Sequence, residues 1–199
     1  MESLQIVPLE EKYLGDVVQI HRNVLGYTFN SRLGIDHLSF LYKAIAQDPK
    51  SYVGVALLDD QPVGTVSGTL DMDKIKTSML KSYQLEQWKH LVLHILGQPS
   101  VIHEWWKGNV IGRPVYFEEK LIRPILTTIA VDSRYQGKGV GKSLVRKLED
   151  FFRRKNVNTY RLDTLAENTG ARKFYESLGF RQVEQRADSI VFVKKIFDG

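Results

Sequence analysis

A glycine-rich turn between an apolar run and a long amphipathic stretch is the feature that most constrains how this chain can fold. Residues 129–143 read IAVDSRYQGKGVGKS, so glycine stands at positions 137, 139 and 141. Beyond them, apolar residues recur at helical spacing, with basic residues on the opposite face. Glycine lets backbone N–H groups approach an anion, and a helix start adds roughly half a positive charge aimed at it. The stretch therefore predicts a strand, a phosphate-binding turn and a helix.

Two common phosphate-binding motifs do not fit this turn. A P-loop that ends in Lys142-Ser143 requires glycine at position 136, where the chain has Gln136. A dinucleotide-binding G-x-G-x-x-G motif that begins at Gly137 requires glycine at position 142, which is Lys142, and no first-strand context accompanies it. Spacing therefore excludes both motifs.

Periodicity along the rest of the chain predicts one α/β domain over residues 1–199. We expect strands at 4–8, 52–58, 62–70, 125–131, 159–164, 182–183 and 190–196, and helices at 9–24, 36–45, 137–155 and 168–178. Asp36 is the expected N-cap of the second helix, and residues 59–61 are expected to close an antiparallel hairpin. Residues 71–119 are expected to form an inserted helical segment, with an irregular stretch rich in Gly, Pro and Trp near its end.

The turn is also the start of a recognisable motif. Gln136-x-x-Gly139-x-Gly141 resembles the Q/R-x-x-G-x-G/A signature of the GNAT superfamily of acyl-CoA-dependent N-acetyltransferases. Residues 167–180 (ENTGARKFYESLGF) are similar to the second GNAT motif, N-x-x-A-x-x-[FL]-Y-x-x-x-G-F. The resemblance is strong over about residues 121–184 and architectural before residue 70. It implies a mixed, mostly antiparallel central sheet flanked by helices.

The resemblance also implies where a cofactor binds. In this family acetyl-CoA lies in a V-shaped split between two strands, here 125–131 and 159–164. The pantetheine arm is then held by backbone groups of the first strand, the pyrophosphate by amides of the glycine turn, and the 3′-phosphate by a nearby cation. The residues that this comparison assigns to acetyl-CoA are Ile129, Val131, Arg134, Gln136, Gly137, Lys138, Gly139, Val140, Gly141, Lys142 and Asn168. The acceptor amine is expected to attack the thioester directly, without a covalent enzyme intermediate.

Two of the family positions have a plain structural alternative. Tyr175 stands at the family's tyrosine, whose hydroxyl donates a proton to the departing CoA thiolate. It also belongs to an apolar helical stripe with Ala171, Phe174 and Leu178, which packing alone explains. Asn168 is expected to cap the helix that it starts, with or without a contact to CoA.

The general base of the family has no counterpart here. Many members place glutamate on the central strand, but this chain has Leu126-Thr127-Thr128-Ile129-Ala130 there. Thr127 or Thr128 can order a relaying water, although threonine cannot accept a proton at neutral pH. The substitutes that the sequence offers are Glu118, Glu119, Asp163 and His103. An acceptor amine of low pKa would need no base.

The acceptor is expected on the side built by the first two helices and the segments before the central strand. Candidate contacts there are Tyr27, Phe29, Asn30, Trp105, Trp106 and Tyr116. We expect the primary amine of a small metabolite or amino sugar. The alternatives are a protein N-terminus or lysine, and a non-catalytic CoA-binding sensor.

Composition excludes several further classes of function. The chain has no cysteine, which excludes disulfides and thiol nucleophiles. Its net charge is +5, and residues 134–161 hold nine basic side chains against two acidic ones, which favours a multiply phosphorylated cofactor over a polyanionic partner. We therefore expect no nucleic-acid partner.

Metal binding and membrane insertion are not expected either. His90 and His94 stand four residues apart and His103-Glu104 follows, but no third metal ligand is recognisable. No apolar run approaches the length of a membrane span, and residues 1–5 do not resemble a secretory signal. A cytoplasmic monomer or homodimer is the expectation.

Overall fold

The structure is a computed structural model that describes residues 3–82 and 114–196. In these ranges the main sheet has seven strands in the order β1-β2-β3-β6-β7-β9-β8. Their bounds, in that order, are Leu4–Pro8, Ser51–Leu58, Gln61–Thr69, Ile125–Val131, Thr159–Leu165, Ser189–Lys195 and Arg181–Gln185. All neighbouring strands run antiparallel except β6 and β7. This confirms the expected mixed, mostly antiparallel sheet.

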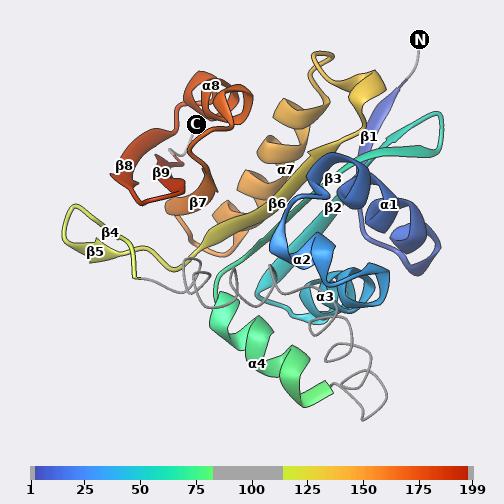
Figure 1. Cartoon of the computed structure of the whole chain (residues 1–199), viewed down its shortest axis with the longest axis horizontal. Helices are drawn as coiled ribbons and strands as arrows, with labels where there is room; N and C mark the ends of the chain where they lie inside the picture. The colour runs from blue at the N-terminus through green and yellow to red at the C-terminus, as the bar shows by residue number, and fades with distance from the viewer. Residues whose placement is uncertain (1–2, 83–113, 197–199) are drawn as a thin grey trace.

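Helices cover both faces of this sheet. They are α1 (Leu14–Leu25), α2 (Phe29–Arg32), α3 (Ile35–Gln47), α4 (Met72–Ser82), α7 (Val140–Arg154) and α8 (Thr169–Ser177), with 3₁₀ turns η1 (Glu11–Tyr13) and η2 (Ser133–Tyr135). Figure 1 shows β6 crossing the centre of the molecule, with β2 and β3 on one side and β7 and β9 on the other. No helix within the described ranges is long and apolar enough to span a membrane.

The sheet separates two large hydrophobic cores, one on each of its faces. On one face α7 packs Leu144, Leu148 and Phe152 against the sheet. On the other face α1, α3 and α4 pack together over β2, whose Val53 and Val55 are buried there. Successive residues of a strand point to opposite faces of the sheet, so these buried residues show which face each of their neighbours is on.

The hairpin of β2 and β3 forms where the sequence predicts it. Residues Asp59 and Asp60 both have positive φ (47° and 62°), the conformation of a type I′ turn that matches the twist of two antiparallel strands. Asp tolerates this conformation better than most residues. The strands 4–8 and 125–131 have the predicted bounds, and the other predicted strands and helices differ by a few residues at their ends.

Three expectations were wrong in part. The segment 71–119 is helical at α4 but also contains a short hairpin, β4 (Tyr116–Phe117) with β5 (Lys120–Leu121), whose turn places two residues at positive φ. Asp36 is not an N-cap, because α3 begins at Ile35 and Gly34, at φ 98°, precedes it. The helix expected from 137 begins at Val140, because Gly137 and Gly139 have positive φ. Residues 83–113 lie outside the described ranges.

A buried carboxylate joins α7 to the C-terminal strands. Glu149 accepts a hydrogen bond from the Tyr160 hydroxyl (2.7 Å) and one from Lys194 Nζ (2.6 Å). Its side chain is only 5% exposed, so it depends on these partners. The interaction ties α7, β7 and β9 together beneath the split described below.

We predict that Glu149→Ala lowers the free energy of unfolding by about 3 kcal/mol, because it leaves Lys194 without its buried partner. This is the lower end of the cost of breaking a buried ion pair, since Lys194 is partly exposed to water. The control is Asp150→Ala, which removes an exposed partner of Arg153 and should cost less than about 1 kcal/mol. Urea unfolding measures both. Equal costs for the two variants would contradict this account of Glu149.

Candidate functional site

The central feature of the site is a split between the parallel strands β6 and β7. Their register contains one pair, Ile125 with Arg161, and the Arg161 N–H donates to the Pro124 carbonyl (3.0 Å) at the same end. Beyond that point β6 remains paired to β3, and β7 remains paired to β9. The two strands therefore part toward their carboxyl ends, and the backbone of β6 that faces β7 is left without a strand partner among the described residues. This is the geometry of the predicted V-shaped split.

A β-bulge lies on β6 at the start of the split. Ser67 pairs with Thr128 and Gly68 with Leu126, which leaves Thr127 as the extra residue. The Thr127 hydroxyl forms a hydrogen bond with Ser67 Oγ at 2.7 Å. Ser67 lies on the face away from α7, because the neighbouring Gly68 approaches Leu148 of α7. The bulge therefore turns the Thr127 hydroxyl toward the face covered by α1 and α3.

A buried polar network supports the same strand. The Tyr42 hydroxyl contacts His21 Nδ1 at 2.8 Å and also forms hydrogen bonds with the Thr65 and Thr128 side chains. Burial raises the pKa of Tyr42 and lowers the pKa of His21 to about 4, so both are neutral at pH 7. This network links α1 and α3 to the strand that carries the split. No local sequence pattern predicts this network, because only the fold brings residues 21, 42 and 128 together.

The glycine turn closes tightly at the end of β6. Gln136 Nε2 donates to the Val131 carbonyl (2.9 Å), so the amide of the first motif residue holds the turn against the strand. Gly137 and Gly139 have φ values of 74° and 85°, which L side chains rarely adopt, and α7 begins directly afterwards. Gly141 lies close to the Phe174 ring, since a Cβ there would approach it to 3.1 Å. The start of α7 thus points free N–H groups toward the split.

The three cations proposed for the 3′-phosphate differ in their surroundings. Arg134 binds Asp132 through two hydrogen bonds, Nε at 3.0 Å and Nη2 at 2.7 Å, which lowers the pKa of Asp132. Lys138 Nζ lies 5.2 Å from the centre of the Tyr135 ring. Lys142 is exposed on α7. A phosphate must compete with Asp132 for Arg134, so Lys138 and Lys142 are the better-placed candidates.

Helix α8 brings a cap, a buried phenol and an acceptor-side residue together. Asn168 Oδ1 accepts from the Ala171 N–H (2.9 Å), which confirms the predicted N-cap. Asn168 Nδ2 lies 3.5 Å from the Tyr27 hydroxyl, at the end of α1. Tyr175 is 7% exposed and packs against Phe180 and Phe192, and burial raises its pKa. The nearby Tyr27 also raises the pKa of Tyr175, by a smaller amount than burial does.

The substitute bases fall in different places. Glu118 binds Lys195 (2.8 Å) on the exposed β4–β5 hairpin, and Glu119 stands beside it in the turn. Asp163 lies on β7 inside the fold and binds Arg161 (2.6 Å), with Arg186 at 3.6 Å. His103 lies outside the described residues. Of the carboxylates of Glu118, Glu119 and Asp163, that of Asp163 alone lies on a strand of the split.

The acceptor candidates are only partly described. Tyr27 is half-exposed at the end of α1, and Phe29 and Asn30 follow it in α2, where Asn30 Oδ1 accepts from His37 Nε2 (3.3 Å). Tyr116, on the β4–β5 hairpin, is 62% exposed. Trp105 and Trp106 lie outside the described residues, as do His90, His94 and Glu104. Among the residues that the structure does describe, no group of three metal-binding side chains occurs.

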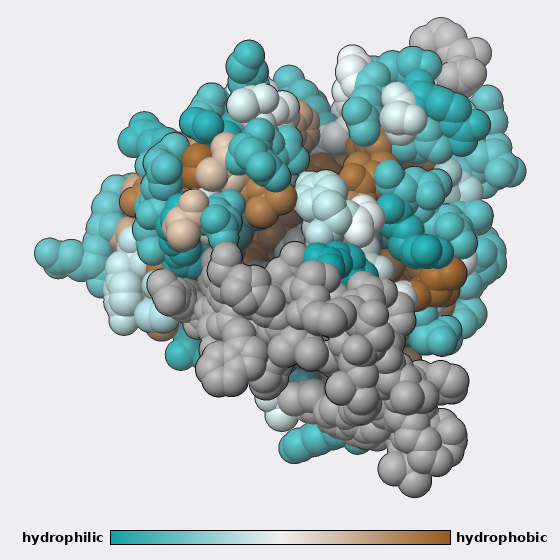
Figure 2. Space-filling view, viewed as in Figure 1, coloured by the Kyte–Doolittle hydropathy of each residue, from teal (hydrophilic) through white to brown (hydrophobic). Residues whose placement is uncertain are grey.

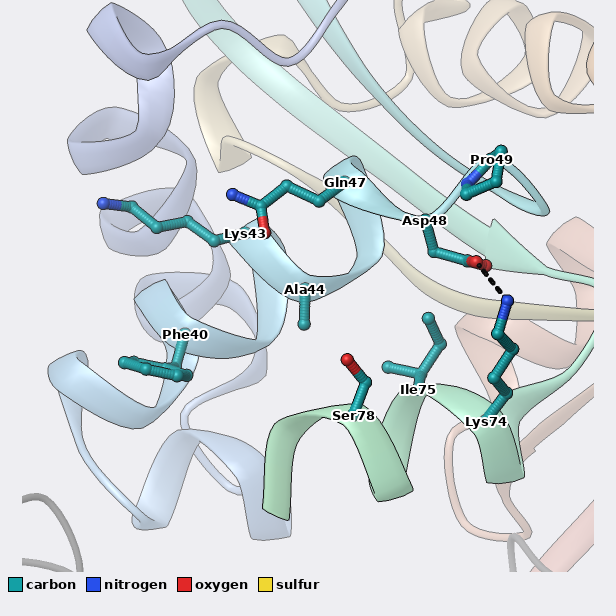
Figure 3. Close-up of a pocket in the computed structure, with 9 residues that line it drawn as sticks. All are labelled: Phe40, Lys43, Ala44, Gln47, Asp48, Pro49, Lys74, Ile75 and Ser78. Atoms are coloured by element: carbon teal, nitrogen blue, oxygen red, sulfur yellow. Dashed lines mark hydrogen bonds and ion pairs between the residues drawn. The ribbon is translucent and has the colours of Figure 1, made fainter. Parts of the chain in front are cut away.

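Two hollows lie on the described surface. One of about 510 Å³ lies between α1 and the turn after β6, lined by Ile20, Asn23, Val24, Asp132, Ser133, Arg134 and Gln136. The other, of about 370 Å³, lies between α3 and α4, where Lys74 of α4 binds Asp48 after α3 (Figure 3). The first adjoins the glycine turn. Figure 2, seen from the same side as Figure 1, shows hydrophobic residues gathered in a recess near the centre of the molecule. The second contains no residue assigned to the site.

A split between two parallel strands beside a glycine turn and a basic helix is the arrangement expected of an acyl-CoA-dependent acyltransferase. Residues 16–180 match the model of the Acetyltransferase (GNAT) family, and the chain belongs to that family. Over its whole length the fold is similar to that of the PaiA N-acetyltransferase from Thermoplasma acidophilum in complex with coenzyme A. The TM-score is 0.63 at 14% identity, with 97% of this chain and 99% of that one covered.

Similarity to characterised relatives is strongest over short stretches. Human N-acetylaspartate synthetase is 39% identical over 79 residues, which is 38% of this chain and 26% of that protein. The Escherichia coli enzyme named [ribosomal protein bS18]-alanine N-acetyltransferase is 41% identical over 61 residues, 31% of this chain and 41% of that protein. Yeast N-alpha-acetyltransferase 30 matches a longer stretch, 136 residues at 23% identity, 67% of this chain and 77% of that protein.

We predict that Asn168→Ala lowers the free energy of unfolding by about 1 kcal/mol, because the first turn of α8 loses the acceptor for its Ala171 N–H. Asn168→Asp keeps an oxygen in the same place but removes the amide that faces Tyr27, so its stability should remain close to that of the unchanged protein. Urea unfolding of the two variants measures the cap alone. An equal loss in both would show that the amide, not the cap, stabilises this region.

Proposed function

We propose that this protein transfers an acetyl group from acetyl-CoA to a primary amine. The observation that carries the proposal is the split between β6 and β7, which opens directly above the glycine turn and the N-terminus of α7. An extended thiol-linked arm can take the place of a strand beside β6, while its phosphates meet the N–H groups of the turn. Membership of the GNAT family and the similarity to a CoA-bound neighbour support this reading.

The residues proposed to hold acetyl-CoA follow the geometry of the split. Backbone groups of Ile129 and Val131 would bind the pantetheine arm and polarise the thioester carbonyl. The N–H groups from Gly137 to Gly141 would bind the pyrophosphate, and Gln136 would keep the turn in shape through its bond to Val131. Lys138 and Lys142 would meet the 3′-phosphate, with Arg134 available when it leaves Asp132.

Tyr175 is the proposed proton donor to the leaving thiolate. Its raised pKa keeps the phenol protonated at neutral and mildly alkaline pH, as a donor requires. Its ring is packed by three aromatic neighbours, so the hydroxyl is held in a fixed place. The packing role and the proton-donor role of Tyr175 are therefore compatible, because the ring packs in the core while the hydroxyl donates the proton.

For the acceptor, we propose the amine of a small amino-acid-like metabolite. Support comes from a stretch of 79 residues that is 39% identical to N-acetylaspartate synthetase, although it covers only 26% of that protein. A protein N-terminus is the second candidate, favoured by the longer match to N-alpha-acetyltransferase 30 and by the bS18-alanine enzyme. Incubation with acetyl-CoA and a panel of L-aspartate, glucosamine and peptides that begin with alanine or methionine, with release of CoA thiol as the readout, discriminates these acceptors. A protein that binds acetyl-CoA and releases no thiol with any of them would instead be a sensor.

We predict that acetyl-CoA at 100 times its Kd raises the free energy of unfolding by about 2.7 kcal/mol. Gly139→Ala should weaken this binding at least several-fold, because alanine is strained at a φ of 85° and the turn must change shape. Gly170→Ala is the matched control, since a Cβ there meets nothing closer than 3.8 Å. Calorimetric titration measures all three proteins. If acetyl-CoA neither stabilises nor binds the unchanged protein, the proposed function is wrong.

We predict that Tyr175→Phe lowers kcat by on the order of 10²-fold or more while binding of acetyl-CoA is retained. The phenylalanine ring keeps the packing against Phe180 and Phe192, so urea unfolding should change little. Tyr13→Phe, at the start of α1, removes a phenol hydroxyl far from α8 in sequence and serves as control. A Tyr175→Phe enzyme with undiminished kcat would remove Tyr175 from the mechanism.

A further inference from the structure

The position from which many relatives supply a strand carboxylate is occupied by threonine in this chain. On β6 the bulge places Thr127 and Thr128 there, and their hydroxyls are committed to Ser67 and Tyr42. Neither hydroxyl can take a proton from an amine at neutral pH. If this chain uses a general base, it must come from another element that faces the same side of the split.

The opposite strand provides a carboxylate at the matching place. Ile125 and Arg161 are the register pair of β6 and β7, and two residues beyond them stand Thr127 and Asp163. Tyr160 and Leu162 point into the core beneath α7, so Arg161 and Asp163 point to the other face. Their partners on β9, Val193 and Val191, belong to a small hydrophobic cluster with Val115 that is separate from the core beneath α7. The Thr127 hydroxyl points to this same side of the sheet.

We propose that Asp163 is the general base of the reaction, supplied from β7 in place of the glutamate that β6 lacks. This inference rests on the proposed function, since a base is needed only where an amine attacks a thioester. Asp163 takes one proton from the acceptor ammonium and passes it to solvent. The amine then forms the new C–N bond, and the C–S bond breaks. Tyr175 protonates the leaving sulfur and is reprotonated by the second proton that the nitrogen releases, so one proton is released per acetyl group transferred.

Two arginines favour the charged form of this carboxylate, which is mostly buried. The Asp163 side chain is 11% exposed, and Arg161 and Arg186, 7% and 6% exposed, lie at 2.6 and 3.6 Å. Burial raises the pKa of Asp163 and so does the nearby Glu184, whereas both arginines oppose the increase. A carboxylate whose pKa is raised by burial is a stronger base than an exposed one, and the two arginines favour its ionised form.

The chain offers a matched control in the same ion network. Glu184, on β8, binds Arg186 through two hydrogen bonds of 2.9 Å, and it pairs with Val191 of β9, as Asp163 does from the other side. Its side chain is 42% exposed and lies two strands further from the split, because β9 stands between β7 and β8. Removing either carboxylate disturbs the network around Arg186, but only one of them faces the split. A purely structural role predicts similar effects, and a base predicts different ones.

The experiment compares Asp163→Asn, Asp163→Glu and Glu184→Gln with the best acceptor from the panel above. We expect Asp163→Asn to lower kcat/KM for the amine by on the order of 10²–10⁴-fold at pH 7 with acetyl-CoA binding unchanged. Asp163→Glu should recover part of the rate, and Glu184→Gln should stay within about threefold of the unchanged enzyme. The Asn variant should recover in alkaline buffer, where the amine loses its proton without help.

The pH profile provides a readout that a structural role would not move. The base works when deprotonated, so kcat/KM falls as pH drops through the pKa of Asp163. Arg186→Gln removes an opposing positive charge and should move this acid limb to higher pH, whereas Glu184→Gln should move it to lower pH.

Three results would overturn the inference: full activity of Asp163→Asn at pH 7, equal losses in Asp163→Asn and Glu184→Gln, or an acid limb that neither charge change moves. These results leave the proposed function standing. Failure of the unchanged protein to bind acetyl-CoA, or to acetylate any acceptor in the panel, would instead remove the proposed function and this inference with it.

Discussion

The single register pair between β6 and β7 is the constraint on which the rest of the site depends. Parallel strands that stayed paired would leave no backbone groups for a ligand, whereas strands that part after Ile125 and Arg161 expose the edge of β6 without dividing the fold. The opening persists because each strand is fully engaged on its other side, β6 with β3 and β7 with β9. Glu149 then ties α7 to β7 and β9 across the same region. The split is therefore a property of the whole sheet, and a ligand can occupy it without unfolding any strand.

The glycine turn contributes two things to this opening: the conformation of its glycines and the hydrogen bond of Gln136. Gly137 and Gly139 adopt backbone conformations that side chains disfavour, which lets α7 begin with its N–H groups directed at the end of β6. Gln136 fixes that arrangement through a bond to the last residue of the strand. The motif thus works as a mechanical unit in which the amide closes the turn and the glycines leave it accessible. This explains why counting glycines alone gives the wrong motifs, whereas including Gln136 gives the right one.

Local patterns were sufficient for most of the fold because each predicted strand or helix buries one face that its own residues specify. The strand at 125–131, the cap at Asn168 and the hairpin at Asp59 and Asp60 all depend on neighbours within a few positions. The bulge at Thr127, the contact of Tyr27 with Asn168 and the network of His21, Tyr42 and Thr128 depend on pairings across 60 to 141 positions or on three separate elements. Such contacts have no periodicity to detect. The β4–β5 hairpin escaped for a different reason, since two-residue strands are too short to alternate.

The same reasoning explains how a base can move between strands while the chemistry stays the same. A proton acceptor is useful only at a place in space, and the two walls of the split are equally close to its centre at the point where they part. A carboxylate on β7 needs positive partners, because that strand lies between β6 and β9 and is buried. Arg161 and Arg186 provide these positive charges. Burying three charges in a small domain carries a desolvation cost, which a catalytic role of Asp163 would explain. The hydroxyls of Thr127 and Thr128 instead bind the strand to β3 and α3, so on this wall these two side chains are structural and the strand's backbone remains open to a ligand.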